Sequence, residues 1–320
     1  MKFVNYSDYH YNDYAFNFND NWKKYLDEHG FVVIKNILNH DVCENFKKKL
    51  WKSLKSLSDN NLDDPIYKKY AKNYPYSLHG GMYNIGHTKT QWAARFRCKK
   101  VYEKIWNDKD LITSFDKFCY CPKERVFQKQ KLSAWLHSDQ SPLNNITSYQ
   151  GLLCLTDNTK LNSGGFVCIP KTNLIHKEIC KENGDENNKQ DWIKLTDEFK
   201  EKYITEDNVL KVKNKVGDFV LWDSKTIHSG TVPRNTRELG YDRVCIYICM
   251  RPRKEAVKRT LTRRIQSFVD KRNTTHNPVN FKLFEKKLGR HSSLSYEEIL
   301  KRLRDNNLLV EDIEKIRKLI

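Results

Sequence analysis

Two histidines and one aspartate have the residue types and the spacing of a metal site. His137 and Asp139 form a His-x-Asp triplet, and His228 follows a glycine-initiated apolar segment over residues 217–222 and a turn. Two imidazoles and one carboxylate on one face of an ion leave positions open, as in the non-haem Fe(II) centres that activate O2 beside a 2-oxo acid. We therefore predict that these three residues are both the metal ligands and the catalytic residues. The alternative is a surface His-x-Asp pair and an unrelated turn histidine.

Strands must position these side chains. Residues i and i+2 of a strand point to the same side, so a strand that ends at His137 and Asp139 directs both at one ion and turns Ser138 away. Short apolar segments separated by Gly, Pro, Asn and Asp predict strands at 131–136, 149–155, 165–169, 209–212, 218–222 and 244–250. We expect a mainly β fold, a sandwich or barrel with flanking helices.

A second group of residues is predicted to bind the co-substrate. Arg243 begins the last predicted strand, and its planar guanidinium suits a carboxylate such as the distal one of 2-oxoglutarate. Lys131 and Gln150, on predicted strands beside the metal motif, are further candidates for cofactor binding. Arg234 and Arg237 remain alternatives to Arg243, although neither begins a strand. A plain salt bridge is the other interpretation of Arg243.

With their flanks, these motifs resemble the phytanoyl-CoA dioxygenase (PhyH-like) family of Fe(II)/2-oxoglutarate-dependent oxygenases, in a branch without assigned substrate. The matching segments are 137–142, 149–157, 164–170, 217–228, 243–252 and 274–278. The resemblance implies a double-stranded β-helix, also called a jelly roll or cupin-like fold. It also implies Fe(II) on His137, Asp139 and His228, 2-oxoglutarate on Arg243, and hydroxylation with release of succinate and CO2. His276 is then expected to be structural, because the ligand set is already complete.

The expected organisation is an oxygenase domain over 1–290 and a helical tail over 291–320. Within the domain we expect a helical N-terminal part (1–110), a β-helix core (111–250) and a basic helical flank (251–290). Residues 59–90 are predicted to be loop, with a lid over 73–90, and 174–206 a helical insertion beside the barrel mouth. Ser295 and Glu298 form a capping box that starts the first of two short C-terminal helices.

The charge of the chain is concentrated rather than spread. Of 320 residues, 58 are Lys or Arg and 40 are Asp or Glu, a net charge of +18. Residues 251–290 hold thirteen of these basic residues and three of the acidic ones. Such a block is either a solvated helix face or a patch for phosphate-bearing partners. We expect a small-molecule or anionic substrate. The alternative is a basic nucleic-acid-associated protein, either a non-catalytic scaffold or an oxygenase acting on bases.

The remaining composition indicates the compartment. The chain contains no run of about 18 apolar residues, so no membrane span is expected, and its first residues lack an apolar signal segment. The nine cysteines fall mostly in apolar runs, and their spacing does not match a zinc site. We therefore expect buried free thiols and a cytoplasmic location. The sequence leaves the oligomeric state open.

Overall fold

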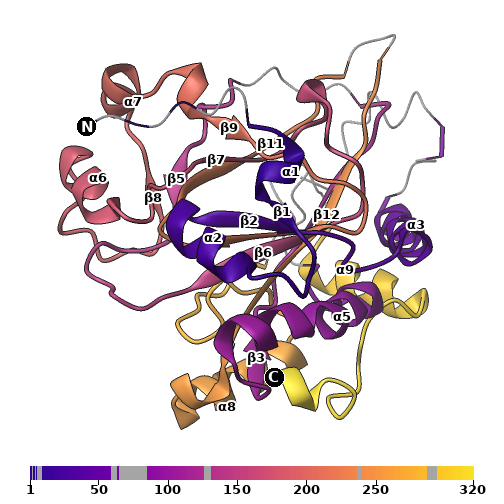
Figure 1. Cartoon of the computed structure of the whole chain (residues 1–320). Helices are drawn as coiled ribbons and strands as arrows, with labels where there is room; N and C mark the ends of the chain where they lie inside the picture. Colours follow the sequence, from indigo (N-terminus) through magenta and orange to yellow (C-terminus); the bar gives the residue numbers. More distant parts are fainter. Residues whose placement is uncertain are drawn as a thin grey trace.

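Two β-sheets form the centre of the protein, and helices cover the outside (Figure 1). The computed structural model describes residues 1, 3, 5, 9–58, 63–64, 85–125, 131–235, 239–286 and 294–320. A layer of apolar side chains lies between the sheets: Leu152, Val220 and Trp222 come from one sheet, and Phe166 and Cys168 from the other. Burial of this layer holds the two sheets together.

The larger sheet has the strand order β1-β2-β10-β6-β12-β3, with β4 paired to β12. All its pairs are antiparallel except β1 with β2. Its strands are β1 (Ala15–Phe16), β2 (Phe31–Ile34), β3 (Leu111–Thr113), β4 (Phe118–Cys121), β6 (Tyr149–Cys154), β10 (Phe219–Asp223) and β12 (Arg243–Pro252).

The smaller sheet is antiparallel throughout and has the order β8-β5-β11-β7-β9. Its strands are β5 (His137–Ser138), β7 (Gly165–Ile169), β8 (Ile193–Lys194), β9 (Leu210–Lys211) and β11 (Ile227–Thr231). From β4 to β7 and from β9 to β12, successive strands alternate between the two packed sheets, as in a jelly roll. The predicted fold class, a β-helix core with flanking helices, is confirmed.

Helices precede, interrupt and follow the strands. They are α1 (Tyr11–Tyr14), α2 (Trp22–His29), α3 (His40–Ser56), α5 (Lys89–Trp106), α6 (His176–Glu182), α7 (Asp197–Tyr203), α8 (Lys258–Val269) and α9 (Tyr296–Asp305). Helix α5 packs against β12 and β3 of the larger sheet, and α3 contacts both α5 and α9 (Figure 1). Asn39 caps α3 by accepting from Val42 N–H at 3.0 Å. Ser295 and Glu298 form the predicted capping box of α9. None of the described helices is long and apolar enough to cross a membrane.

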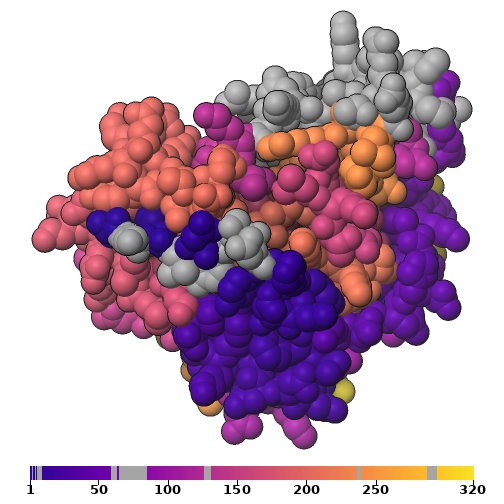
Figure 2. All heavy atoms as spheres, turned by 45° about the horizontal axis from the view of Figure 1, so that its top comes forward, coloured from indigo at the N-terminus to yellow at the C-terminus, as the bar shows by residue number. Residues whose placement is uncertain are grey.

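The N-terminal residues lie across one side of the molecule (Figure 2). Phe3 packs against a separate apolar cluster that contains Ile179 of α6 and Phe199 of α7. Helices α6 and α7 lie in the insertion over 174–206, which was predicted to be helical. The insertion also contributes strand β8, which pairs with β5. The insertion is thus joined directly to the strand that carries His137.

Some predicted elements are wrong. The chain turns at 132–135 instead of forming a strand over 131–136, because Ala134 N–H bonds back to the Lys131 carbonyl at 3.2 Å. The second C-terminal helix is a single 3-10 turn, Arg317–Leu319. Leu319 N–H bonds to the Ile316 carbonyl three residues earlier at 2.9 Å, which is the hydrogen bond of a 3-10 turn. Most of the predicted lid over 73–90 lies outside the described residues, and 89–90 begin α5.

Candidate metal centre and active-site cavity

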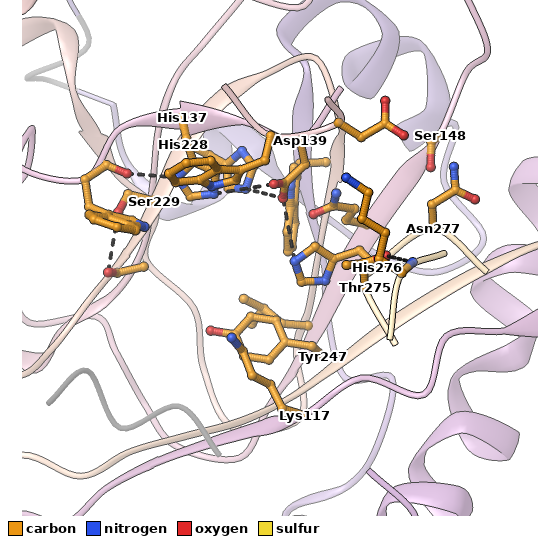
Figure 3. Close-up of a pocket in the computed structure, with 18 of the residues that line it drawn as sticks. Lys117, His137, Asp139, Ser148, His228, Ser229, Tyr247, Thr275, His276 and Asn277 are labelled. Atoms are coloured by element: carbon orange, nitrogen blue, oxygen red, sulfur yellow. Dashed lines mark hydrogen bonds and ion pairs between the residues drawn. The ribbon is translucent and has the colours of Figure 1, made fainter. Parts of the chain in front are cut away.

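Strands of the smaller sheet bring His137, Asp139 and His228 together. His137 and His228 are directly paired across β5 and β11, and Asp139 follows β5 with its N–H bonded to the Ser224 carbonyl at 2.9 Å. Among the described residues this is the one group of three or more His, Cys, Asp or Glu whose ligand atoms all lie within 4.8 Å of one another. Figure 3 shows the two imidazoles meeting the Asp139 carboxylate from one side.

The hydrogen bonds of the two imidazoles leave the inward nitrogens free for a metal. His137 Nδ1 lies 2.8 Å from the Trp135 carbonyl, and His228 Nδ1 lies 2.8 Å from the Thr226 carbonyl. A carbonyl accepts, so each Nδ1 carries the proton and each Nε2 presents a lone pair. These lone pairs face Asp139 at 3.7 Å and 3.4 Å, respectively. Three electron donors directed at one another fit a bound cation.

The pKa shifts agree with this arrangement. Burial, followed by the neighbouring His228, lowers the pKa of His137 to about 4, so its imidazole is neutral near pH 7. Burial alone would raise the pKa of Asp139, but its attraction to the surrounding histidines in their protonated form outweighs burial and holds the pKa well below its usual range. A neutral imidazole at His137 and an ionised carboxylate at Asp139 are the protonation states that a divalent metal requires of these ligands.

The three residues open into a cavity of about 520 Å³, within the usual range for small-molecule sites. Phe166 and Trp222 pack around His228, with ring centroids 5.6 Å and 5.2 Å from it. Trp135 and Trp192 stand on the other side, 5.8 Å apart, and each is 43% exposed. The site therefore has an apolar wall behind the ligands and an aromatic pair toward solvent.

Arg243 lies in the same cavity and is 3% exposed. Its Nη2 lies 3.3 Å from the Tyr247 hydroxyl, and no carboxylate of the described residues forms an ion pair with it. A buried guanidinium without a counter-ion is costly, so its surroundings fit an anionic ligand. Gln150 also lines the cavity, and its buried Oε1 has no hydrogen-bond partner among the described residues.

Lys131 and Arg234 do not line this cavity. Lys131 is exposed at the start of the turns before β5, so its predicted strand conformation is wrong. Arg234 does not line the cavity; its N–H bonds to the Asn162 carbonyl at 2.8 Å. Arg237 lies outside the described residues.

The cavity includes residues that were not predicted as site residues. Tyr247 is four positions after Arg243 on β12, and strand periodicity places both on one face, so this residue could have been found. Trp192 lies on the insertion, and Asn277 lies after α8. His276 was expected to be structural, yet it lines the cavity with its Nε2 3.7 Å from Asp139 Oδ2.

The basic block over 251–290 does not form one surface. Arg251, Arg264 and Lys271 are at most 3% exposed, and Lys282 lines the cavity. The exposed basic residues of α8 are Lys258, Arg259 and Arg263. The described part of the block therefore includes buried structural cations, a cavity residue and a short helix face.

Comparisons with known proteins agree with the geometry. The family model described as phytanoyl-CoA dioxygenase (PhyH) matches residues 26–237, which include His137, Asp139 and His228. The chain belongs to the phytanoyl-CoA dioxygenase family. Enzymes of this family use Fe(II), 2-oxoglutarate and O2, and this member is accordingly a 2-oxoglutarate-dependent oxygenase. Arg243 and His276 lie beyond the matched residues.

The individual relatives share little sequence identity with this chain. The Ava biosynthesis cluster protein O of Aspergillus versicolor is 26% identical over 272 residues, which are 80% of this chain and 85% of that protein. A hypothetical protein from Escherichia coli has a similar structure, with a TM-score of 0.54, 12% identity, and coverage of 91% of this chain and 85% of its own. The GlcNAc-inducible gene 2 product of Candida albicans gives a TM-score of 0.51 at 13% identity, covering 74% of this chain and 66% of its own. The two structural similarities support the fold.

Proposed function

We propose that this protein hydroxylates a small organic molecule, with Fe(II) held by His137, Asp139 and His228 and with 2-oxoglutarate bound through Arg243. The observation that carries the proposal is the pair of carbonyl-fixed imidazoles facing one buried carboxylate. The guanidinium of Arg243 lies in the same cavity and forms no ion pair with a described carboxylate, which supports the co-substrate assignment.

Fe(II) bound there would supply the activation of O2, which is consumed with 2-oxoglutarate and a C–H bond to give succinate, CO2 and the hydroxylated product. The protein's own residues bind the metal and 2-oxoglutarate and hold them in position. The Trp135 and Thr226 carbonyls fix the orientation of the two ligand rings. Arg243 and the Tyr247 hydroxyl present donors to the distal carboxylate of 2-oxoglutarate. Phe166 and Trp222 exclude water behind His228.

The substrate side of the cavity is assigned to Trp135 and Trp192. Exposed large aromatic side chains beside a buried polar site are typical of ligand contact. His137 and Trp192 have ring centroids 6.2 Å apart, so a molecule on the Trp192 ring would lie next to the proposed metal. We propose that this aromatic pair holds a ring or another flat apolar part of the substrate.

The test is to load the purified protein with Fe(II) and 2-oxoglutarate, supply air, and measure succinate. We expect succinate above background for the wild type and background for His137→Ala. Adding a cell extract should raise the succinate rate, and mass spectrometry should find a metabolite that gains one oxygen atom. Trp192→Ala should lose the stimulation by extract while keeping the basal rate. A wild-type protein that binds neither metal nor 2-oxoglutarate would contradict the proposal.

A further inference from the structure

A third histidine faces the proposed metal centre from the side opposite the two ligand rings. Asp139 lies between His276 on one side and His137 and His228 on the other (Figure 3). The Nε2 atom of His276 is 3.7 Å from Asp139 Oδ2, and Oδ2 is a buried oxygen without a hydrogen-bond partner among the described residues. The ligand cluster does not include His276.

The partner of the outer nitrogen distinguishes His276 from the two ligand histidines. His137 and His228 direct Nδ1 at backbone carbonyls, whereas His276 Nδ1 bonds to the carboxylate of Asp116. A carbonyl fixes a neutral imidazole, but two carboxylates, one at each nitrogen, favour an imidazole that donates from both nitrogens. His276 therefore presents an N–H to Asp139, where His137 and His228 present lone pairs.

Asp116 is built into the core as a fixed support. It is 1% exposed, and its Oδ1 accepts from Lys117 N–H at 2.7 Å. Its carbonyl accepts from Arg95 at 3.1 Å and from Gln91 at 3.2 Å, both on helix α5. An aspartate held at its backbone carbonyl and at Oδ1 leaves Oδ2 for His276 and can keep the His276 ring in one orientation.

The segment that carries His276 is joined to the segment that carries Asp116. Thr274 N–H donates to the Phe115 carbonyl at 3.1 Å, and Phe115 N–H donates to Thr274 Oγ1 at 2.9 Å. Residues 115–116 and 274–276 thus form one connected unit that reaches from α5 to the cavity. The second segment of this unit, 274–276, lies beyond the family match, which ends at 237.

We propose that Asp116 and His276 are positioning residues for the metal centre: Asp116 orients His276, and His276 donates a hydrogen bond to Asp139 Oδ2, which fixes the carboxylate for metal binding. Such partners of metal ligands typically change metal affinity 10- to 100-fold when removed. The inference rests on the proposed function, because it assumes that Asp139 is a ligand.

The experiment measures Co(II) binding to the metal-free protein by visible absorption, and Fe(II) binding under anaerobic conditions. His276→Ala should lower the metal affinity 10- to 100-fold and change the Co(II) absorption band. His276→Gln, which keeps a donor, should recover part of the loss. Asp116→Asn should weaken binding in the wild-type background and have no further effect in the His276→Ala background. His87→Gln is the control, since His87 is a buried histidine that bonds to a backbone carbonyl, that of Arg272, and does not line the cavity.

The outcomes separate the positioning role from the alternatives. Unchanged metal affinity in His276→Ala, or additive effects of the two substitutions, would overturn the inference. A loss as complete as that of His228→Ala would make His276 a ligand and would also overturn it. If the wild type binds no metal, the proposed function itself fails. Removing His276 leaves Asp116 as a buried unpaired charge, so Asp116→Asn/His276→Gln replaces His276→Ala if that variant does not fold.

Discussion

His137 and His228 face each other as a cross-strand pair of β5 and β11, with ring centroids 4.5 Å apart. The two residues are far apart in the sequence, and antiparallel pairing alone brings their rings together. The insertion strand β8 holds β5 from the other edge through its own pairing with His137. The geometry of the proposed metal centre therefore depends on the register of the sheet. A shift of β5 by one residue against β11 would turn one imidazole away.

Loss of one ligand should remove metal binding. We expect His228→Ala to lower the affinity for Fe(II) more than 100-fold and to reduce succinate formation to background, because two remaining donors cannot hold the ion in an open site. Calorimetric titration of the metal-free protein measures the affinity. His40→Ala is the control, since the His40 side chain is 68% exposed and far from the cavity. Equal metal binding by both variants would contradict the assignment.

Arg243 should determine the affinity for 2-oxoglutarate rather than for the metal. Arg243→Lys keeps the charge but loses the planar fork. We expect the KM for 2-oxoglutarate to rise about 10- to 100-fold, because one charge-assisted hydrogen bond contributes about 1.5–3 kcal/mol. Metal affinity should stay unchanged. Arg263→Lys, on the exposed face of α8, should behave as the wild type, and an unaltered KM in Arg243→Lys would argue for another arginine.

Gly230 limits the space beside the Arg243 guanidinium. A Cβ atom at this position would lie 3.0 Å from Arg243 Nη2. We expect Gly230→Ala to displace the guanidinium and to raise the KM for 2-oxoglutarate about tenfold, with metal affinity within twofold of the wild type. In the Arg243→Lys background the same substitution should add little. A Gly230→Ala enzyme with a lowered metal affinity would show that the change acts on β11 and His228 instead.

Sequence spacing predicted that His137 and Asp139 lie together, because residues i and i+2 of a strand follow a local rule. Arg243, the proposed co-substrate residue, begins an apolar strand as predicted. Strand β11 was not predicted, because Ile227-His228-Ser229-Gly230-Thr231 lacks the apolar alternation of a typical strand. Its strand conformation comes from pairing with β5 and β7.

The cavity walls could not be predicted from the sequence. Trp192 and His276 reach the cavity through contacts between segments distant in sequence, and neither stands in a periodic pattern that points to a site. Asp191 shows how these contacts arise: it accepts from Ser141 N–H at 3.1 Å and from Asn280 at 3.4 Å, and so connects the insertion to the segment after α8. Local sequence rules do not predict such connections.

His176 should make the protein less stable in acid. It is buried behind β5, with Nε2 3.0 Å from Ser138 Oγ, and burial lowers its pKa from 6.5 to about 4. Between these values the unfolded chain binds the extra proton, so stability falls as the pH decreases from 6.5 through 4. His176→Gln cannot titrate, and its free energy of unfolding should fall less over this interval, by up to roughly 3 kcal/mol. Urea unfolding at several pH values tests this; parallel curves would contradict it.

The C-terminal tail should stabilise the protein by packing against its hydrophobic core. Leu303 of α9 is fully buried in the cluster that contains Leu50 of α3 and Cys98 of α5. Two arginines of the basic block hold the end of the tail: the buried Arg264 donates to the Leu319 carbonyl at 3.3 Å, and the partly exposed Arg253 donates to the Lys318 carbonyl at 3.3 Å.

Leu303→Ala should therefore lower the free energy of unfolding by about 2–5 kcal/mol, as cavity-forming core substitutions do. Lys301→Ala, on the exposed face of the same helix, should change it by less than about 0.5 kcal/mol. Urea denaturation with and without metal measures both. If the tail instead docked on a partner, Leu303→Ala would leave the isolated protein as stable as the wild type.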